Sequence, residues 1–409
     1  MTRHICALAV ACAIVGAGAL ASAQTPSSGT TDDPAASARF HLGVLHFTPA
    51  LQINNVGVDN NVFNSAGDPK ADTTAAVGPV VNLWLKTGPA RLSAVAGGQY
   101  LYFKTYGNQR AWNTADTLRW ELTRGRLRPF VTGAFSNTKD RPGFEIDSRV
   151  RQKQQVWTAG ANLSIGGRST LLLEGGQTHL NYDQSQQNFG VNVAQTLDRR
   201  TDLQRAQFRS VLTPLTTWVV SAETLQDRFD AERTRNSDSV RVSTGFDLKP
   251  AALISGQVLV GFRRLNMLTR GLPDFNGVAA SASVSMVFGG VNRLSISEQR
   301  DVSYSYDPAY PFYVLTGTSA QVQRKLGRSW DVVGRGALNH LGYRAATPQS
   351  GGNPSDRLVQ YGAGFGYTVG TQLRVGLDAN YYTRTSGSGV AAEFSGFRAG
   401  LSLSYGMPK

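Results

Sequence analysis

Five arginines are the side chains through which this chain is best placed to act on a solute. Each falls on the polar phase of a segment that alternates between apolar and polar residues. Successive side chains of a strand point to opposite faces, so all five would project from the polar face of a sheet. Rings of Arg or Lys give pores a preference for anions. The pattern indicates a basic face suited to phosphorylated solutes or an acidic polysaccharide, formed by Arg241, Arg263, Arg335, Arg374 and Arg398.

A second interpretation is that the same arginines neutralise carboxylates. Asp247, Asp378 and Glu174 share the polar phase and would complete a solvated network of ion pairs. Other basic residues would contact phosphate groups outside this network. The net charge of +13 is compatible with both interpretations. Nucleic-acid binding is disfavoured because the positive charges are dispersed along the chain.

Two histidines are the candidates for acid–base chemistry. His179 and His340 fall near the outer ends of expected strands, where either could be the general base of a barrel hydrolase. A lone histidine at a strand end is more commonly an interfacial polar residue. The chain has no G-x-S-x-G, no H-E-x-x-H and no cluster with metal-ligand spacing. We therefore expect no enzyme activity, no metal and no cofactor.

The N-terminus has the features of an exported protein. Arg3 precedes an apolar run over residues 8–20, and small residues at 21–23 form a cleavage site, so residues 1–23 are expected to be a signal peptide. Both cysteines, Cys6 and Cys12, lie within it, which removes disulfides and thiolate chemistry from the mature chain. Residues 24–44, rich in Ser, Thr, Pro and Ala, are expected to be a flexible periplasmic lead.

The elements that must position these side chains are long strands. Residues 157–165, 239–249, 278–288 and 372–384 each place apolar residues on one phase and polar residues on the other. The alternating segments run for roughly ten to fourteen residues, whereas soluble strands average about five or six. No apolar run of 18 residues follows the N-terminus, which excludes a helical membrane protein.

The connections between these segments alternate between short and long. Long polar stretches at 141–154, 183–199, 227–238, 345–356 and 385–393 separate short turns, as in outer-membrane barrels. Eight short turns with both termini in the periplasm predict a single antiparallel barrel over residues 45–409 with about 18 strands, with 16 as the alternative. The turns fall at 86–89, 124–126, 166–168, 214, 249–250, 289–292, 326–328 and 370–371.

The last segment resembles the C-terminal signal read by the barrel-assembly machinery. Phe397, Leu401, Leu403 and Tyr405 lie on one phase and end on an aromatic residue. The usual form ends on the aromatic itself, whereas residues 406–409 follow here.

Short pieces of the chain are similar to those of the outer-membrane β-barrel porins. They are Pro-Ala-Leu at 49–51, Val-Asp-Asn-Asn-Val-Phe at 58–63, Tyr-Asp at 182–183, Leu-Thr-Pro at 212–214, Gly-Phe-Arg at 261–263 and Ser-Tyr-Gly at 404–406. The resemblance implies a barrel, and an association with exopolysaccharide genes, among which members of that family often sit. It brings no catalytic residues.

The expected function is a porin-like channel in the outer membrane of a Gram-negative bacterium, passing anionic solutes or exporting an exopolysaccharide. A barrel of 16 to 18 strands is wide enough for an aqueous channel. Residues 183–199 are the longest candidate for an inward-folded loop. The alternative is a sealed barrel that anchors polysaccharide or partner proteins, and a barrel hydrolase ranks last. Expected partners are outer-membrane lipids and lipopolysaccharide, the barrel-assembly machinery, an anionic polysaccharide and periplasmic export proteins.

Overall fold

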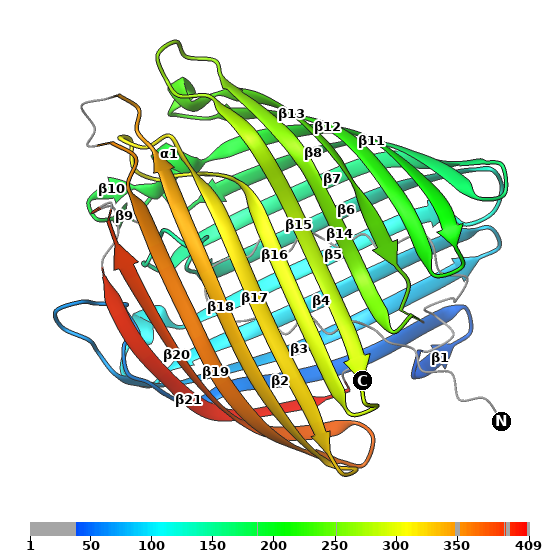
Figure 1. Cartoon of the computed structure of the whole chain (residues 1–409). Helices are drawn as coiled ribbons and strands as arrows, with labels where there is room; N and C mark the ends of the chain where they lie inside the picture. Colours follow the sequence, from blue (N-terminus) through cyan, green and yellow to red (C-terminus); the bar gives the residue numbers. More distant parts are fainter. Residues whose placement is uncertain are drawn as a thin grey trace.

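The chain folds as a closed antiparallel barrel in a computed structural model (Figure 1). The structure describes residues 38–185, 187–250, 252–347, 352–387, 389 and 393–406. Within them, one sheet holds 19 strands, and removing the three-residue β1 (Phe40–Leu42) leaves 18 that form the wall. The prediction of about 18 strands is confirmed, and the alternative of 16 is wrong.

The wall strands are 12 to 16 residues long, which is enough to cross a bilayer at a tilt. In chain order they are β2 (Leu45–Asp59), β3 (Asp72–Thr87), β4 (Ala90–Phe103), β5 (Ala111–Leu122), β6 (Leu127–Asp140), β7 (Val150–Ile165), β8 (Ser169–Tyr182), β11 (Arg199–Thr213), β12 (Thr216–Phe229), β13 (Ser237–Leu248), β14 (Ile254–Met267), β15 (Phe275–Phe288), β16 (Asn292–Tyr304), β17 (Phe312–Leu326), β18 (Trp330–Arg344), β19 (Ser355–Val369), β20 (Leu373–Ser386) and β21 (Phe394–Tyr405).

Small elements lie in the connections between wall strands. They are β9 (Gln187–Asn188), β10 (Val191–Asn192), α1 (Val193–Leu197), η2 (Gly107–Gln109) and η3 (Arg233–Arg235). No helix in the described ranges is long and apolar enough to cross a membrane. The signal peptide expected at 1–23 lies outside the described residues, as does most of the expected lead at 24–44. Residues 40–42 of that segment form β1, which pairs with β2.

The two ends of the barrel differ, as the turn spacing predicts. Eight connections of two to five residues, beginning with 88–89, join strands at one rim, here called the short-turn end. Nine longer connections, from 60–71 to 387–393, join them at the other rim, the long-loop end. Gly88 and Gly370 take positive φ angles of 59° and 62° in their tight turns, a conformation in which a side chain would be strained.

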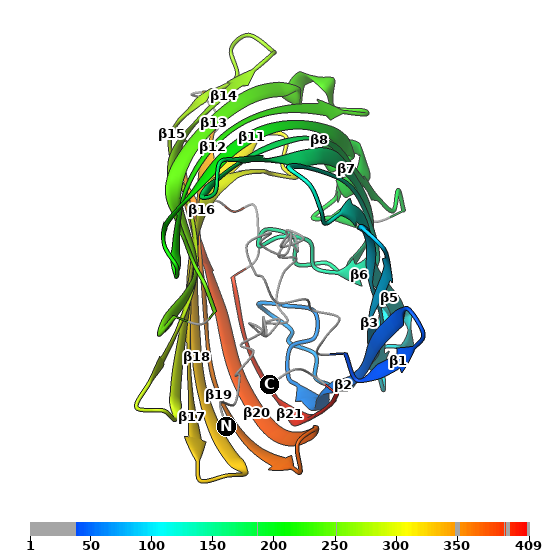
Figure 2. The ribbon, with the colours of Figure 1, turned by 90° about the vertical axis from the view of Figure 1, so that its right-hand side faces the viewer.

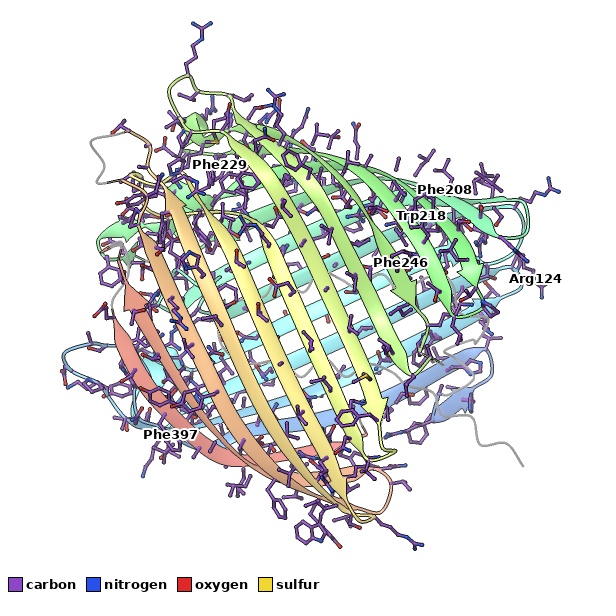
Figure 3. All side chains as sticks on the ribbon, in the orientation of Figure 1. Arg124, Phe208, Trp218, Phe229, Phe246 and Phe397 are labelled. Carbon is purple, nitrogen blue, oxygen red and sulfur yellow. The ribbon has the colours of Figure 1, made fainter. Side chains whose placement is uncertain are left out.

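The predicted phase of the strands also holds. Val240, Val242 and Phe246 are 51%, 52% and 45% exposed on β13, while Ser239 and Ser243 on the opposite phase are buried. Figure 3 shows Phe246 with Phe208 and Trp218 on the neighbouring strands. We call the apolar, exposed face outward and the opposite, polar face inward. The outward face is the one expected against lipid, and the inward face lines the lumen.

The ring closes where the first and last wall strands pair. β2 and β21 run antiparallel, with Leu51 opposite Tyr405, and the register shifts between Ile53 and Val56. Asn55 lies at this bulge with a φ of 55°. The predicted assembly residues Phe397, Leu401, Leu403 and Tyr405 share the outward face of β21; their recognition by the assembly machinery stays a prediction.

An arginine introduced on each face in turn should show which face contacts lipid and which contacts water. We expect Val242→Arg, at mid-strand on the outward face, to destabilise the barrel by about 2–4 kcal/mol, the cost of Arg at the bilayer midplane. Ser281→Arg, at mid-strand on the inward face of β15, should cost less than about 1 kcal/mol because water can hydrate it. Urea unfolding of both variants in lipid vesicles measures the difference. Equal losses of stability would contradict the assignment of faces.

Candidate functional site

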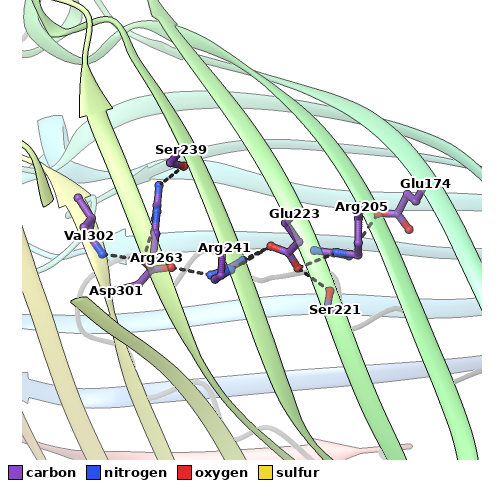
Figure 4. Close-up of polar contacts among 9 residues, drawn as sticks. All are labelled: Glu174, Arg205, Ser221, Glu223, Ser239, Arg241, Arg263, Asp301 and Val302. Atoms are coloured by element: carbon purple, nitrogen blue, oxygen red, sulfur yellow. Dashed lines mark hydrogen bonds and ion pairs between the residues drawn. The ribbon is translucent and has the colours of Figure 1, made fainter. Parts of the chain in front are cut away.

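The inward face carries a row of alternating charges that crosses several strands, shown in Figure 4. Arg205 Nε lies 2.8 Å from Glu223 Oε1, and Arg205 Nη1 lies 3.3 Å from Glu174 Oε1. Arg241 Nε donates to Glu223 Oε2 at 3.0 Å. Asp301 completes the row because it accepts from both Arg241 and Arg263 at 2.7 Å. We call this the charged ladder: Glu174, Arg205, Glu223, Arg241, Asp301 and Arg263.

Small residues on β15 allow the ladder to cross that strand. β15 separates β14, which carries Arg263, from β16, which carries Asp301. Gly277 lies opposite Arg263, and the next inward position holds Ala279, which is buried. With no larger side chain in the way, both guanidinium groups reach over β15 to the same carboxylate.

The other three predicted arginines also lie against carboxylates. Arg335 Nη2 is 2.6 Å from Asp378 Oδ1, and Arg374 Nη2 is 2.6 Å from Asp331 Oδ1. Arg398 Nη2 is 2.5 Å from Asp59 Oδ2 at the closure of the ring. Of the carboxylates proposed as their partners, Asp378 contacts Arg335, Glu174 contacts Arg205 and Asp247 contacts Arg209. The arginines therefore share the inward face, and each of the five has an acidic neighbour.

An uncharged stretch of wall lies beside the ladder. On the inward faces of β15, β16 and β17, hydroxyl and amide side chains oppose one another in register: Ser283 faces Ser297, and Ser297 faces Ser319. Ser281, Ser283, Ser297 and Gln299 are exposed to solvent there. We call this the hydroxyl–amide wall: Ser281, Ser283, Ser285, Ser295, Ser297, Gln299, Ser319 and Gln321.

Loops of the long-loop end fold into the ring, as Figure 2 shows for blue and teal segments inside the wall. The fully buried Arg384 of β20 holds one of them, since its Nη1 lies 3.0 Å from Asp147 Oδ2 in loop 141–149. Its Nη2 lies 3.7 Å from Asp356 Oδ2 of β19. Glu145 of the same loop accepts hydrogen bonds from the Ser305 hydroxyl and, at 3.0 Å, from the Tyr306 amide.

Two more loops join this assembly. Loop 60–71 is held through Val62, whose carbonyl accepts from Arg141 Nη2 at 2.7 Å and Arg149 Nη1 at 2.9 Å. Loop 183–198 contributes apolar side chains to a buried cluster with loops 141–149 and 305–311 and with β17–β19. We call the whole assembly the mouth cluster; its apolar core is Ile146, Val150, Val193, Leu197, Tyr306, Tyr310, Tyr313, Leu315, Leu341, Tyr343 and Leu358. The prediction named loop 183–199 alone, whereas four loops take part.

Burial changes the acid–base behaviour of the mouth cluster. It raises the pKa of the Glu145 carboxyl to about 8, against the hydrogen bonds from Ser305 and Tyr306, which lower it. Burial also raises the pKa of Asp147 and brings that of Asp198 to about 6. Near neutral pH Glu145 is therefore mostly protonated, and the packed loops carry less negative charge than their sequence shows.

The two predicted histidines face outward near the long-loop end. His179 Nε2 lies 2.7 Å from Gln177 Oε1, and His340 lies opposite Arg357. In the described part of the chain, neither hydrogen-bonds to a Ser or Asp side chain, so no hydrolase pair is assembled there. No group of His, Cys, Asp and Glu in the described ranges could hold a metal ion.

Residues 34–404 match the family model described as "Putative beta-barrel porin 2". Solved structures with a similar shape include a BenF-like porin from Pseudomonas fluorescens Pf-5 (14% identity, TM-score 0.48, covering 88% of this chain and 98% of that one). OprD from Pseudomonas aeruginosa has 11% identity and a TM-score of 0.48, covering 92% of this chain and 98% of that one. The FrpB iron transporter from Neisseria meningitidis has 9% identity and a TM-score of 0.44; 83% of this chain spans only 62% of that one. No curated protein matches the sequence.

Proposed function

The chain belongs to the putative beta-barrel porin 2 family, and we propose that this porin-like channel of the Gram-negative outer membrane carries hydroxyl-rich solutes past an uncharged wall. The observation that carries the proposal is the solvent-exposed hydroxyl–amide wall beside a ladder whose charges are paired. Serine and glutamine side chains can exchange hydrogen bonds with a polyhydroxyl solute without holding it by charge. Favourable but weak binding at many sites suits conduction.

A surface polysaccharide is the specific solute that we propose. Its repeating hydroxyl groups match a wall that repeats hydroxyl and amide groups over three neighbouring strands. Acidic sugars remain compatible, because the five lumen arginines keep hydrogen-bond donors beyond their carboxylate contacts. Export would place the long-loop end outside the cell and both termini in the periplasm, the usual orientation of such barrels.

The mouth cluster favours a second candidate, a barrel that is closed at rest and serves as a surface anchor. Three loops pack an apolar core against the inner wall, with Arg384 and Tyr343 fully buried, and hydrogen bonds hold loop 60–71 to this assembly. A sealed mouth would pass no ions, so conductance separates the two functions.

Single-channel recording in a planar bilayer, with a KCl gradient, tests the proposal. We expect steady openings with weak ion selectivity and a current that polysaccharide fragments block reversibly. Blocking should weaken when Ser283, Ser297 and Ser319 are replaced together by alanine. Openings that these fragments do not affect would contradict the polysaccharide proposal, and silence from a folded, heat-modifiable barrel would favour the anchor.

Removing one ladder carboxylate should change the ion selectivity. Asp301→Asn leaves Arg241 and Arg263 without their shared acid, adding one positive charge to the lumen. A unit charge at about 4 Å is worth about 1 kcal/mol in water, so the chloride-to-potassium permeability ratio should rise several-fold. The reversal potential measures it.

The control is Asp116→Asn, which removes the same charge from the outward face of β5. Its reversal potential should match that of the wild type. An unchanged potential in Asp301→Asn would mean that the ladder lies outside the ion path.

A further inference from the structure

A group of cations faces outward at the long-loop end, on three of the strands that carry the charged ladder but on the other side of the wall. His179 of β8 lies directly opposite Arg200 of β11, and Arg200 lies directly opposite Arg228 of β12. Alternation along each strand puts all three on the outward face, because Leu173, Phe208 and Trp218 share their phase. Three neighbouring strands therefore each carry a guanidinium or an imidazole group at the same distance from the long-loop end.

These side chains surround a hollow of about 480 Å³ in the outer surface. The connection after β12 adds Arg233 to its lining, along with Asn236. Asp230 is the one carboxylate among the residues that line it. Three guanidinium groups and an imidazole thus face a single acid.

The arrangement places the guanidinium groups of Arg200 and Arg228 on directly opposed positions of neighbouring strands. Like charges directly opposite each other in a sheet are destabilising. Arg200 lies 2.9 Å from Asp202, and Arg228 lies 2.7 Å from Asp238. Each aspartate occupies the next outward-facing position towards the middle of the membrane. Arg233 has no ion pair in the part of the chain that the structure describes. An anion in the hollow would relieve the repulsion between Arg200 and Arg228.

The height of the hollow points to the kind of anion. Towards the membrane the outward face turns apolar, with Leu173, Phe208, Val240 and Phe262. Away from the membrane lies the polar connection at 230–236. The hollow therefore lies where acyl chains end and headgroups begin. The planar guanidinium group of an arginine can donate two parallel hydrogen bonds to the oxygens of a phosphate.

We propose that this hollow binds the phosphate of an outer-leaflet lipid, with Arg200, Arg228 and Arg233 as ligands and His179 at its edge. The lipid class is an acylated sugar phosphate, as found in lipid A. The inference rests on the proposed orientation, with the long-loop end outside, and is independent of what passes through the lumen.

Binding of fluorescent bisphosphorylated lipid A to the full barrel in detergent tests the proposal. Arg200→Gln/Arg228→Gln/Arg233→Gln should weaken the affinity at least about tenfold, because each substitution removes charge-assisted hydrogen bonds to the phosphate. Dephosphorylated lipid A should bind the wild type as weakly as it binds the variant. The matched control removes three exposed arginines from the short-turn end, Arg124→Gln/Arg126→Gln/Arg168→Gln, and should bind like the wild type.

Three results would overturn the proposal. One is equal lipid A affinity in the triple variant and the control. The second is competition by inorganic phosphate at the concentration of lipid A, which would make the site one for free phosphate. The third is a cysteine at position 231 that an impermeant maleimide cannot label in intact cells, since the hollow would then face the periplasm.

Discussion

Replacing Arg384 by alanine is expected to open the mouth of the channel. The side chain is fully buried and contacts Asp147 of loop 141–149 and Asp356 of β19. Removing one partner of a buried pair costs about 3–5 kcal/mol, because the remaining carboxylates lose their cation. Asp147 avoids this cost when its loop moves into water, so the substitution favours the released position of the loop. The ratio of packed to released loop should fall about a hundredfold or more.

Single-channel conductance measures this release. The Arg384→Ala channel should show larger and longer openings, with heat-modifiability as in the wild type. Asp147→Asn should act in the same direction, and the double variant should add little, because both changes remove one interaction. Arg384→Lys keeps the charge and is the control, with a smaller effect. A conductance equal to the wild type in both single variants would mean that the loop does not obstruct the pore.

The barrel could be predicted because its determinants are local. The alternation in residues 239–249 fixes which side chains of β13 face lipid, and the spacing of turns such as 88–89 and 370–372 fixes the strand number. Both patterns follow from the two-residue period of a strand and the thickness of a bilayer. The same patterns placed Arg241 and Arg263 on the inward face.

The pairing within the lumen could not be predicted in the same way. Asp301 meets Arg263 and Arg241, which precede it by 38 and 60 residues, through a gap that depends on Gly277 and Ala279 of an intervening strand. Arg205 was missed for another reason: residues 202–211 carry polar side chains on both phases, so the period is ambiguous there.

The mouth cluster shows most clearly which contacts could not be predicted from the sequence. Arg384 lies 237 residues from Asp147 in the chain, and neither belongs to a motif. Loops have no period, so their packing follows from the shape of the closed ring. The sequence predicts that a long loop such as 183–199 is available to fold inward, but it gives no indication that 60–71, 141–149 and 305–311 join it.

Raising the pH from 5 to 9 should release the mouth cluster. The pKa of Glu145 is about 8 when the loop is packed, because burial disfavours its charged form, whereas the ordinary pKa of a Glu carboxyl is 4.5. Below pH 4.5 the carboxyl is protonated in both positions of the loop, and packing is at its strongest. Between about 5 and 8 the released loop loses its proton first, so packing weakens progressively. The total is on the order of 5 kcal/mol, at about 1.36 kcal/mol per pKa unit.

The ionisable groups around Glu145 decide how its contribution to the pH dependence of loop packing can be isolated. Arg384 and Arg235 favour its charge, while Asp147, Tyr306 and Tyr343 share its buried surroundings. Asp198, with a pKa of about 6, acts in the same direction but only at lower pH. Burial raises the pKa of Asp147 too, so this carboxyl adds to the effect. Glu145→Gln should therefore remove most of the rise in open probability between pH 6 and 8 while leaving the rise below pH 6. If the open probability of Glu145→Gln rose with pH as in the wild type, another group would be the one that titrates. The same would follow if the wild-type channel closed as the pH rose.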